Sequence, residues 1–212
     1  MMRMLQRYKD GDRINHWIVA LCFILAGLSG LAFFHPAFYF LTALFGGGPW
    51  TRILHPFLGV AMCLGFLGMF LRFWRSNLWS RSDTEWARRS PSLLRGDEHA
   101  MPPVGKYNAG QKGVFWLMTI CLLLLLVTGV MFWQPWFADA FPILARRIAV
   151  LVHAIAAVCL ILGAIVHIYA AIWVKGSIPA MTRGEVSEAW ARQHHPLWAD
   201  EMGVAKRPTE GR

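Results

Sequence analysis

Four apolar stretches, each about as long as a bilayer is thick, constrain this chain more than any other feature. A hydrocarbon core of roughly 30 Å needs about 20 residues of helix, because each residue rises about 1.5 Å and every backbone polar group must be hydrogen-bonded within the span. None of the four contains Asp, Glu, Lys or Arg, and they run from Trp17 to Phe34, Ile53 to Leu71, Val114 to Trp133, and Ile148 to Val174. The sequence therefore predicts an all-α integral membrane four-helix bundle.

The basic residues predict how this bundle is oriented. The 212 residues carry a formal net charge of +9, and most Lys and Arg lie in the N-terminal tail, the middle loop (about 73–113) and the C-terminal tail. They include Arg3, Arg7, Lys9 and Arg13, then Arg72, Arg75, Arg81, Arg88, Arg89, Arg95, Lys106 and Lys112, then Lys175, Arg183, Arg192, Lys206, Arg207 and Arg212. The positive-inside rule puts these three segments in the cytoplasm. This bias explains the charge without nucleic-acid binding.

Several shorter features complete the layout. The first apolar stretch follows basic residues, as in a signal peptide, but it lacks a small-residue cleavage site and is long enough to cross the bilayer. The segment Ala37 to Phe45 is apolar but too short to span, and we expect it at the outer interface, ended by the turn residues 46–49. Each span holds one cysteine, expected to be a buried apolar thiol. No internal repeat is detectable, and a helical turn is expected at 186–193.

Four of the eight histidines lie in or at the ends of the apolar spans: His16, His55, His153 and His167. Ionisable side chains are costly there and point to function, although a single intramembrane His can equally serve as an interhelical hydrogen-bond partner. His153 and His167 share a helix, and the 14 residues between them turn through about 1400°, some 40° short of four full turns, while rising about 21 Å. They therefore lie on one face at two depths.

Pairing the histidines by depth predicts a cofactor. The first helix runs outward and the second and fourth run inward, which pairs His16 with His167 near the cytoplasm and His55 with His153 near the periplasm. Two imidazoles on opposing helices at one depth suit a six-coordinate haem iron, and helical bundles commonly house such groups. Because no C-x-x-C-H motif is present, two non-covalent b haems are expected. A haem-free proton relay remains the alternative from another class.

Other residues fit this picture less specifically. Glycines in the spans would let a macrocycle approach the backbone, or would serve close helix packing equally well. They are Gly27, Gly30, Gly59, Gly65, Gly68, Gly129 and Gly163. Met62, Met69, Met118 and Met131 are interpreted as packing residues, and Arg13, Arg52 and Lys175 as partners for propionates or as interfacial anchors. We expect a cytoplasmic tail over residues 1–16, a four-helix dihaem domain over 17–174 and a second cytoplasmic tail over 175–212.

Five segments together resemble a known family. They are RILHPFLG (Arg52 to Gly59), VGKYNAGQK (Val104 to Lys112), LVTGV (Leu126 to Val130), IVHIYAAIWVKGSI (Ile165 to Ile178) and HHPLW (His194 to Trp198). The chain is similar, from about Asp12 to Trp198, to the membrane cytochrome b (gamma) subunit of respiratory formate dehydrogenases. The resemblance implies the same four haem ligands, His16, His55, His153 and His167, that the topology predicts.

The resemblance also implies an electron path and its partners. In the family, an iron–sulfur subunit with its own transmembrane helix delivers electrons at the periplasmic side, having received them from a molybdenum or tungsten formate dehydrogenase subunit. The cytochrome passes them to a quinone, menaquinone or ubiquinone, near the cytoplasmic side of the bacterial inner membrane. A trimer of heterotrimers, held in membrane lipid, is the assembly that the family suggests. A cytochrome b of a hydrogenase or thiosulfate reductase would share this architecture and remains open.

The quinone site implied by the resemblance comprises Asn108, Gly110, Gln111 and His167. The side-chain amide of Asn108 and the backbone amide of Gly110 can each donate a hydrogen bond to a quinone carbonyl. From the residues alone, the run from Tyr107 to Gly110 is more simply a turn that caps the third long helix. No residue of this chain is expected to touch formate.

Overall fold

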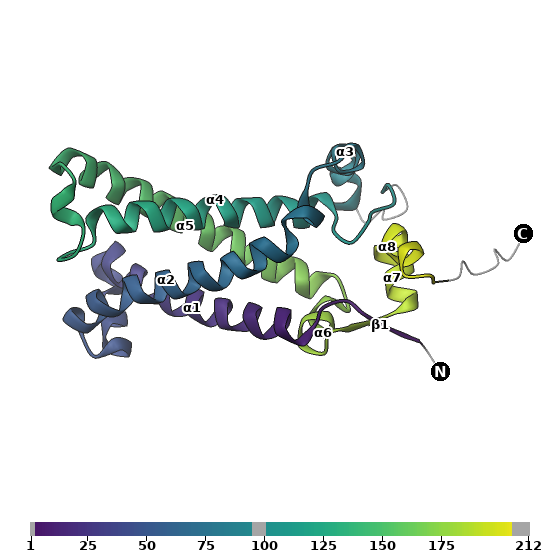
Figure 1. The fold of residues 1–212 in the computed structure, drawn as a ribbon, viewed down its shortest axis with the longest axis horizontal. Helices are drawn as coiled ribbons and strands as arrows, with labels where there is room; N and C mark the ends of the chain where they lie inside the picture. The colour runs from purple at the N-terminus through teal and green to yellow at the C-terminus, as the bar shows by residue number, and fades with distance from the viewer. Residues whose placement is uncertain (1–2, 95–100, 205–212) are drawn as a thin grey trace, which may run out of the picture. The chain divides into compact units, whose positions relative to one another are not determined.

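The computed structural model describes residues 3–94 and 101–204, and four long helices dominate it (Figure 1). They are α1 (Asp10–Phe34), α2 (Gly48–Phe73), α4 (Ala109–Phe132) and α5 (Ile143–Trp173). All four are long and apolar enough to cross a membrane, which confirms the predicted all-α bundle of four spans. Arg95, Lys206, Arg207 and Arg212, which belong to the predicted basic segments, lie outside the described residues.

Each long helix begins before its apolar stretch does. The helix α1 starts at Asp10 and α2 at Gly48. His16 and His55 therefore lie inside these helices, whereas the sequence suggested that His16 precedes the first helix and that His55 begins the second. The physical reason is that hydropathy marks only the part of a helix that suits hydrocarbon, whereas backbone hydrogen bonding continues through polar residues at the ends. In α2, Pro49 follows the first residue, where a missing N–H costs little.

The chain divides into two compact units. The first, here called the membrane unit, comprises Gly11–Arg72 and Leu117–Ile168. The second, here called the polar unit, comprises Met1–Asp10, Phe73–Trp116 and Tyr169–Arg212. The predicted division into residues 1–16, 17–174 and 175–212 remains a prediction. It describes where the chain crosses the membrane surface, whereas the two compact units describe how the residues pack.

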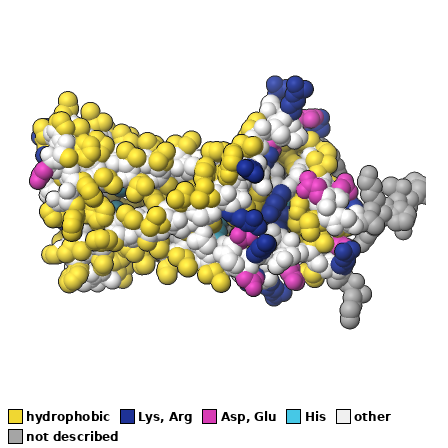
Figure 2. Space-filling view, in the orientation of Figure 1, with side chains coloured by type: hydrophobic (Ala, Val, Ile, Leu, Met, Phe, Trp, Pro, Cys, Tyr) yellow, Lys and Arg dark blue, Asp and Glu magenta, His cyan; other side chains and the backbone are white. Residues whose placement is uncertain are grey.

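The membrane unit has a narrow core and an apolar exterior. Its core contains residues from all four long helices: Val19, Ala26, Met62, Phe66, Cys121, Leu122 and Leu160. Large apolar side chains such as Ile24, Leu64 and Leu123 are more than half exposed, and Figure 2 shows such side chains over the surface of the long helices. An apolar exterior of this extent is stable only in an apolar solvent, which is why the fold requires a bilayer.

The cysteines and glycines of the membrane unit mostly serve helix packing, but one cysteine is exposed. Cys121 is buried in the core and Cys22 and Cys63 pack against it, whereas Cys159 is exposed, contrary to the prediction that all four thiols are buried. A Cβ at Gly65 would lie 2.6 Å from Val19, and Met62 and Met118 are also packing residues, as predicted.

The connections in the membrane unit are short helices. The apolar segment after α1 forms a 3-10 helix, η1 (Pro36–Phe45), whose first free N–H, at Ala37, donates to Nδ1 of His35. It ends at Gly46, where φ is +85°, as the glycine run predicted. The next connection contains η4 (Ala138–Ala140), between α4 and α5.

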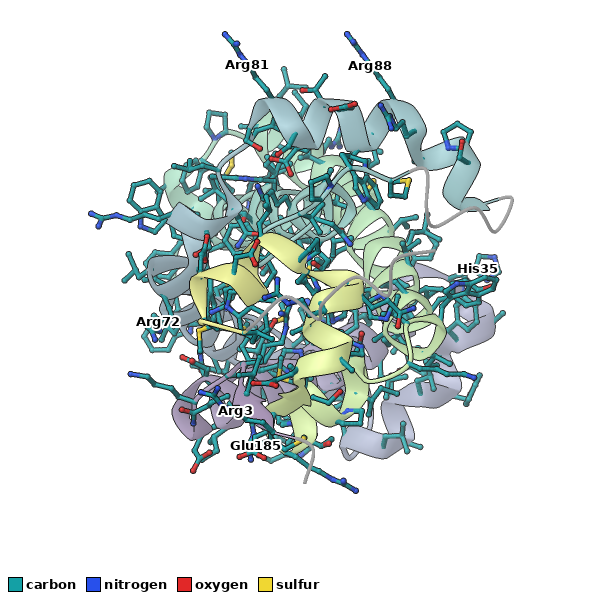
Figure 3. The ribbon with its side chains drawn as sticks, turned by 90° about the vertical axis from the view of Figure 1, so that its right-hand side faces the viewer. Arg3, His35, Arg72, Arg81, Arg88 and Glu185 are labelled. Atoms are coloured by element: carbon teal, nitrogen blue, oxygen red, sulfur yellow. The ribbon has the colours of Figure 1, made fainter. Side chains whose placement is uncertain are left out.

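The polar unit contains more structure than the sequence suggested. The predicted middle loop contains η2 (Trp74–Asn77) and α3 (Arg81–Leu94). At the start of α3, the N–H and the hydroxyl of Ser80 both donate to Oδ2 of Asp83, the N–H over 2.7 Å, and the acidic residue three positions along was the sequence signal for this helix start. Figure 3 shows Arg81 and Arg88 projecting outward from α3.

The C-terminal part of the polar unit is a small packed layer. It contains α6 (Ser177–Thr182), β2 (Glu185–Ser187), α7 (Glu188–His194) and α8 (Pro196–Glu201), and β2 pairs antiparallel with β1 (Met4–Gln6). The expected helical turn at 186–193 therefore begins as a strand and continues as α7. Leu5 and Val186 face each other across the two strands and lie in one buried cluster with Trp198.

Candidate functional site

The four histidines singled out in the sequence form two pairs in the membrane unit. The rings of His55 on α2 and His153 on α5 have centroids 6.2 Å apart, with an angle of 63° between their planes. The rings of His16 on α1 and His167 on α5 are also 6.2 Å apart, with an angle of 52°. We call these the His55 pair and the His16 pair. The partners in each pair are the ones that the topology predicted.

The spacing within each pair suits a metal between the two rings. A metal–nitrogen bond of about 2 Å to each imidazole places the two ring centroids roughly 6 Å apart. Within the described residues, no group of three or more His, Cys, Asp or Glu could hold a metal ion. Two nitrogens at each position are too few for a bare ion, but two is the number of protein ligands that a macrocyclic iron with four nitrogens of its own would take.

The two pairs lie at different levels of the helix that they share. His153 and His167 both belong to α5, which is continuous from Ile143 to Trp173. The 14 residues between them correspond to a rise of about 21 Å. The arrangement therefore provides two separate ligand pairs along one bundle.

The His55 pair is braced by hydroxyl groups and glycines from neighbouring helices. Ser29 Oγ on α1 lies 2.9 Å from Nδ1 of His55, and Thr128 Oγ1 on α4 lies 3.0 Å from Nδ1 of His153. The glycines that follow these residues bring the backbone against the same rings. A Cβ at Gly30 would lie 3.2 Å from Cε1 of His55, and one at Gly129 would lie 3.3 Å from Cε1 of His153.

These contacts leave the other ring nitrogen for a ligand bond. When Nδ1 is engaged by oxygen, Nε2 is the nitrogen that can bind iron, which is the usual arrangement for metal-ligating histidine. A side chain at Gly59, one turn after His55, would meet nothing within 4 Å, so the backbone there does not obstruct a flat group. The residues present therefore fit a haem at the His55 pair.

The His16 pair has a different environment. Nδ1 of His16 is buried without a hydrogen-bond partner within the described residues, and the ring makes an edge contact with Trp17, 5.3 Å between centroids. The neighbouring Asn15 donates from Nδ2 to the carbonyl of Gly65 over 2.8 Å and so joins α1 to α2 beside this pair. His167 is exposed in the chain alone.

Three of the residues predicted to bind quinone, Asn108, Gly110 and Gln111, lie at the start of α4 in the polar unit, whereas the fourth, His167, is on α5 in the membrane unit. The backbone N–H of Gln111 donates to Oδ1 of Asn108 over 2.9 Å, and the N–H of Asn108 donates to Oε1 of Gln111 over 3.0 Å. This reciprocal pair is a capping box, so the simpler interpretation of the segment as a helix cap is observed. Gly110 is exposed beside Trp86, whose ring lies 3.3 Å from where a Cβ would be. A quinone role for Asn108, Gly110, Gln111 and His167 stays a prediction.

The sequence model of the prokaryotic cytochrome b561 family matches residues 7–184. The chain belongs to this family. It is a multi-pass membrane protein of a b-type cytochrome family, which implies haem b as its cofactor. Haem b, when bound, supplies a reversible one-electron carrier, and the two histidine pairs are the candidate positions for it.

Individual relatives are similar over almost the whole chain. The formate dehydrogenase cytochrome b556(fdo) subunit of Escherichia coli strain K12 is 50% identical over 92% of this chain and 92% of its own length. The nitrate-inducible cytochrome b556(Fdn) subunit of the same strain is 44% identical over 98% of this chain and 96% of its own. The cytochrome b556 subunit of Haemophilus influenzae is 40% identical over 94% and 84%. The family resemblance recognised in the sequence is confirmed.

Three residues near the His55 pair were not singled out in the sequence of this cytochrome. Ser29 and Thr128 gave no signal by themselves, because hydroxyl residues in membrane helices commonly bond only to their own backbone. Arg146 lies in the first turn of α5, seven residues before His153, a spacing of almost two full turns that places both on one helix face. Its Nε is buried without a hydrogen-bond partner within the described residues. That spacing was the available signal for Arg146.

The polar unit of the cytochrome contains a second cluster, in which Arg7 is the centre. Its guanidinium lies 4.9 Å from the ring centre of Trp198 and 5.1 Å from that of Trp190, and Nη2 donates to Nε2 of His195 over 3.1 Å. Nδ1 of His195 lies 2.8 Å from the carbonyl of Gly105. Burial and the nearby positive charge of Arg7 lower the pKa of His195 to about 3. His195 is therefore neutral at physiological pH.

A buried ion pair holds the starts of α3 and α4 together. Lys112 Nζ donates to Oδ2 of Asp83 over 2.7 Å and to the carbonyl of Leu78 over 3.0 Å. Burial alone would raise the pKa of Asp83, but hydrogen bonds from Lys112 and Ser80 outweigh it and hold the pKa below its ordinary value. The carboxylate stays ionised, and the chain segment that carries Asn108 is anchored at its next turn.

Proposed function

We propose that this chain is the dihaem cytochrome b subunit of a formate dehydrogenase complex. In this proposal, His55 with His153 and His16 with His167 are the axial ligands of two non-covalent b haems. The observation that carries it is the repeated geometry of the two pairs: rings on different helices with centroids 6.2 Å apart in both. Neutral imidazoles suit this role in a membrane, because they bind iron without burying a charge.

The electron path follows from the two levels. Bound haem supplies one-electron carriers at two depths, so that electrons from an iron–sulfur subunit at the periplasmic side reach a quinone near the cytoplasmic side. The chain's own part is to hold the ligand rings on rigid helices and to keep water from them with an apolar exterior. Placement in the inner membrane, with both termini in the cytoplasm, follows the distribution of Lys and Arg.

The partners in this proposal rest on the family resemblance and on the names of the relatives. The similar proteins are cytochrome b556 subunits of formate dehydrogenases, which favours formate dehydrogenase over a hydrogenase or thiosulfate reductase. We assign an iron–sulfur subunit with a transmembrane helix and, through it, a catalytic formate dehydrogenase subunit, in a trimer of heterotrimers. Membership of a b-type cytochrome family argues against a haem-free proton relay.

The ligand assignment is tested by haem content. The chain, expressed with its partner subunits and purified in detergent, is expected to hold two b haems per polypeptide in a pyridine haemochrome assay. His55→Ala and His16→Ala are each expected to leave one. His35→Ala is the matched control, because His35 is exposed and its ring caps η1 and contacts Phe38 of the same short helix. Absence of haem from the unmodified complex would refute the proposal.

We assign the quinone-reducing site to Asn108, Gly110, Gln111 and His167, and this part can be tested separately. The helix cap uses the side-chain oxygen of Asn108, whereas a quinone carbonyl needs its amide N–H. Asn108→Asp and Asn108→Ser both keep a capping oxygen and remove the amide donor. Each is expected to abolish quinone reduction while both haems remain reducible by dithionite.

The outcome that would contradict the quinone assignment is equally specific. Asn108→Ala removes the cap as well, at a cost of about 1 kcal/mol in helix stability. If only this variant loses quinone reduction, and Asn108→Asp and Asn108→Ser retain it, Asn108 acts as a cap alone.

A further inference from the structure

The two hydroxyl contacts at the His55 pair are equivalent positions in two helical hairpins. In the first hairpin, Ser29 and Gly30 on α1 contact His55 on α2; in the second, Thr128 and Gly129 on α4 contact His153 on α5. The histidine follows the hydroxyl residue by 26 positions in the first hairpin and 25 in the second. This is a local repeat that the sequence does not reveal, because only three residues in each hairpin take part.

The proton arrangement at Ser29 is decided by its second contact. A hydroxyl has one hydrogen to donate, and Ser29 Oγ lies 3.0 Å from the carbonyl of Ala26, which can only accept. The hydroxyl therefore donates to Ala26 and accepts from Nδ1–H of His55. The carbonyl of Ala26 is also a hydrogen-bond partner of His55, and because a carbonyl cannot donate, it too requires the proton on the ring.

The same arrangement is present at Thr128. Its Oγ1 lies 2.5 Å from the carbonyl of Leu124 and 3.4 Å from that of Leu125, so its hydrogen is already directed at the backbone. It accepts from Nδ1–H of His153, which also bonds to the carbonyl of Leu125. In both hairpins, the hydroxyl residue and the carbonyl three positions before it together accept one ring N–H.

We infer that Ser29 and Thr128 are paired positioning residues, which fix both rings of the His55 pair as the Nδ1–H tautomer and make them more electron-donating ligands. The inference rests on the proposed haem ligation and adds what sets the properties of one of the two haems. An N–H that donates to oxygen raises the basicity of the imidazole, and a more basic ligand stabilises ferric over ferrous iron. The potential at the His55 pair is therefore held lower than bare imidazoles would set it.

Both residues are buried, so their hydroxyl groups are not exchanged for water. The residues Ser29 and Thr128 are 0% and 6% exposed. Losing the hydroxyl leaves the ring N–H with the single carbonyl acceptor, and the ring keeps its place against Gly30 or Gly129. The expected effect of removing the hydroxyl is therefore a change in the electron-donating strength of the ring. Loss of packing alone would instead move the ring or release the haem.

The test is redox potentiometry and electron paramagnetic resonance of the purified complex, with both haems resolved. Ser29→Ala and Thr128→Val are each expected to raise the midpoint potential of the same haem and change its ferric signal, with a larger shift in the double variant. Ser29→Thr and Thr128→Ser keep the hydroxyl and are expected to restore both properties. Thr51→Val is the matched control, because Thr51 is a buried residue of α2 whose hydroxyl bonds, among the described residues, to the carbonyls of Gly47 and Thr42 and to neither histidine pair.

Each outcome decides between the inference and its failure. Unchanged potentials and signals in Ser29→Ala and Thr128→Val, with both haems bound, would refute it and leave the proposed function intact. An equal shift of both haems, or the same shift in Thr51→Val, would also refute it. If Ser29→Ala loses a haem, retention in Ser29→Thr supports the inference and loss in both contradicts it. Absence of haem from the unmodified complex would instead refute the proposed function.

Discussion

His195 in the polar unit and His153 in the membrane unit are held in the same way at one ring nitrogen and differ at the other. Nδ1 of each lies against oxygen, the carbonyl of Gly105 for His195 and the hydroxyl of Thr128 for His153. Nε2 of His195 accepts a hydrogen bond from Arg7, whereas the ring of His153 faces that of His55 at 6.2 Å. Both ring nitrogens of His195 have hydrogen-bond partners in this chain. The Nε2 atom of His153 is the nitrogen that suits a bond to a ligand.

The difference shows how one residue type serves structure or cofactor binding. A neutral imidazole has one donor and one acceptor, and a protein that satisfies both has used the residue for packing. A bundle that satisfies only the donor leaves the acceptor to a metal. This criterion separates His195 from His153 more sharply than burial does, since His195 is the more buried residue and binds no metal in our proposal.

The largest expected effect is on haem content. His153→Ala removes one ligand of the His55 pair, and we expect one of two b haems to be lost because a single axial imidazole holds the group weakly. His195→Ala is expected to retain both haems while loosening the cluster around Arg7. Pyridine haemochrome assays on the two purified complexes measure this directly. Equal haem loss in the two variants would break the comparison.

The next effect is a pH dependence confined to the polar unit. Because the pKa of His195 is lowered from 6.5 to about 3 in the folded chain, protonation favours the unfolded state. The stabilisation is complete above pH 6.5, and it decreases as the pH falls from 6.5 towards 3, by up to a few kcal/mol. Amide hydrogen exchange over α7 and α8, corrected for its intrinsic pH dependence, is expected to accelerate between pH 7 and 5.

A variant without the titrating ring sharpens this prediction. His195→Gln is expected to exchange faster at pH 7 and to lose the extra acceleration at pH 5. If the native protein shows no added acceleration over α7 and α8, then His195 is not the neutral, enclosed group described above.

A smaller effect is expected from the glycines beside the His55 pair. A methyl group at Gly129 would press on the ring of His153 from 3.3 Å, and one at Gly30 on His55 from 3.2 Å, so each ring must move by a few tenths of an ångström. Gly129→Ala and Gly30→Ala are expected to alter the absorption band and potential of one and the same haem. Gly11→Ala meets nothing within 4 Å and serves as control. Changes at different haems in the two variants would separate His55 from His153.

The smallest effect concerns Arg146, whose buried Nε lies two turns before His153 on α5. Arg146→Gln removes a positive charge that favours the ferrous state, so the potential at the His55 pair is expected to fall slightly, opposite in sign to the effect of losing Ser29. Arg147→Gln, at an exposed neighbouring position, is expected to do less. Potentiometry of the two variants side by side measures the difference, and a larger fall in Arg147→Gln would contradict the expected effect of the Arg146 charge on this potential.

The sequence determined the membrane class, the four spans and the partners within each histidine pair. These follow from local rules, because an uncharged apolar stretch of about 20 residues can cross a bilayer as a helix and because helix periodicity fixes which residues share a face and a level. It also contained the capping box at Asn108 and Gln111, as well as the resemblance that names the family. The observed helices begin before the predicted spans, because backbone hydrogen bonding continues into polar residues beyond the apolar stretch.

Only the tertiary structure decided which oxygen meets which ring. Ser29 and Thr128 are ordinary hydroxyl residues in apolar helices, and they acquire a role because α1 and α4 bring them within 3.0 Å of histidines about 25 positions away. Arg7 and His195, 188 positions apart, meet for the same reason. A hydrogen bond depends on a few tenths of an ångström between distant segments, and that distance is set by the packing of whole helices, not by any pattern along one of them.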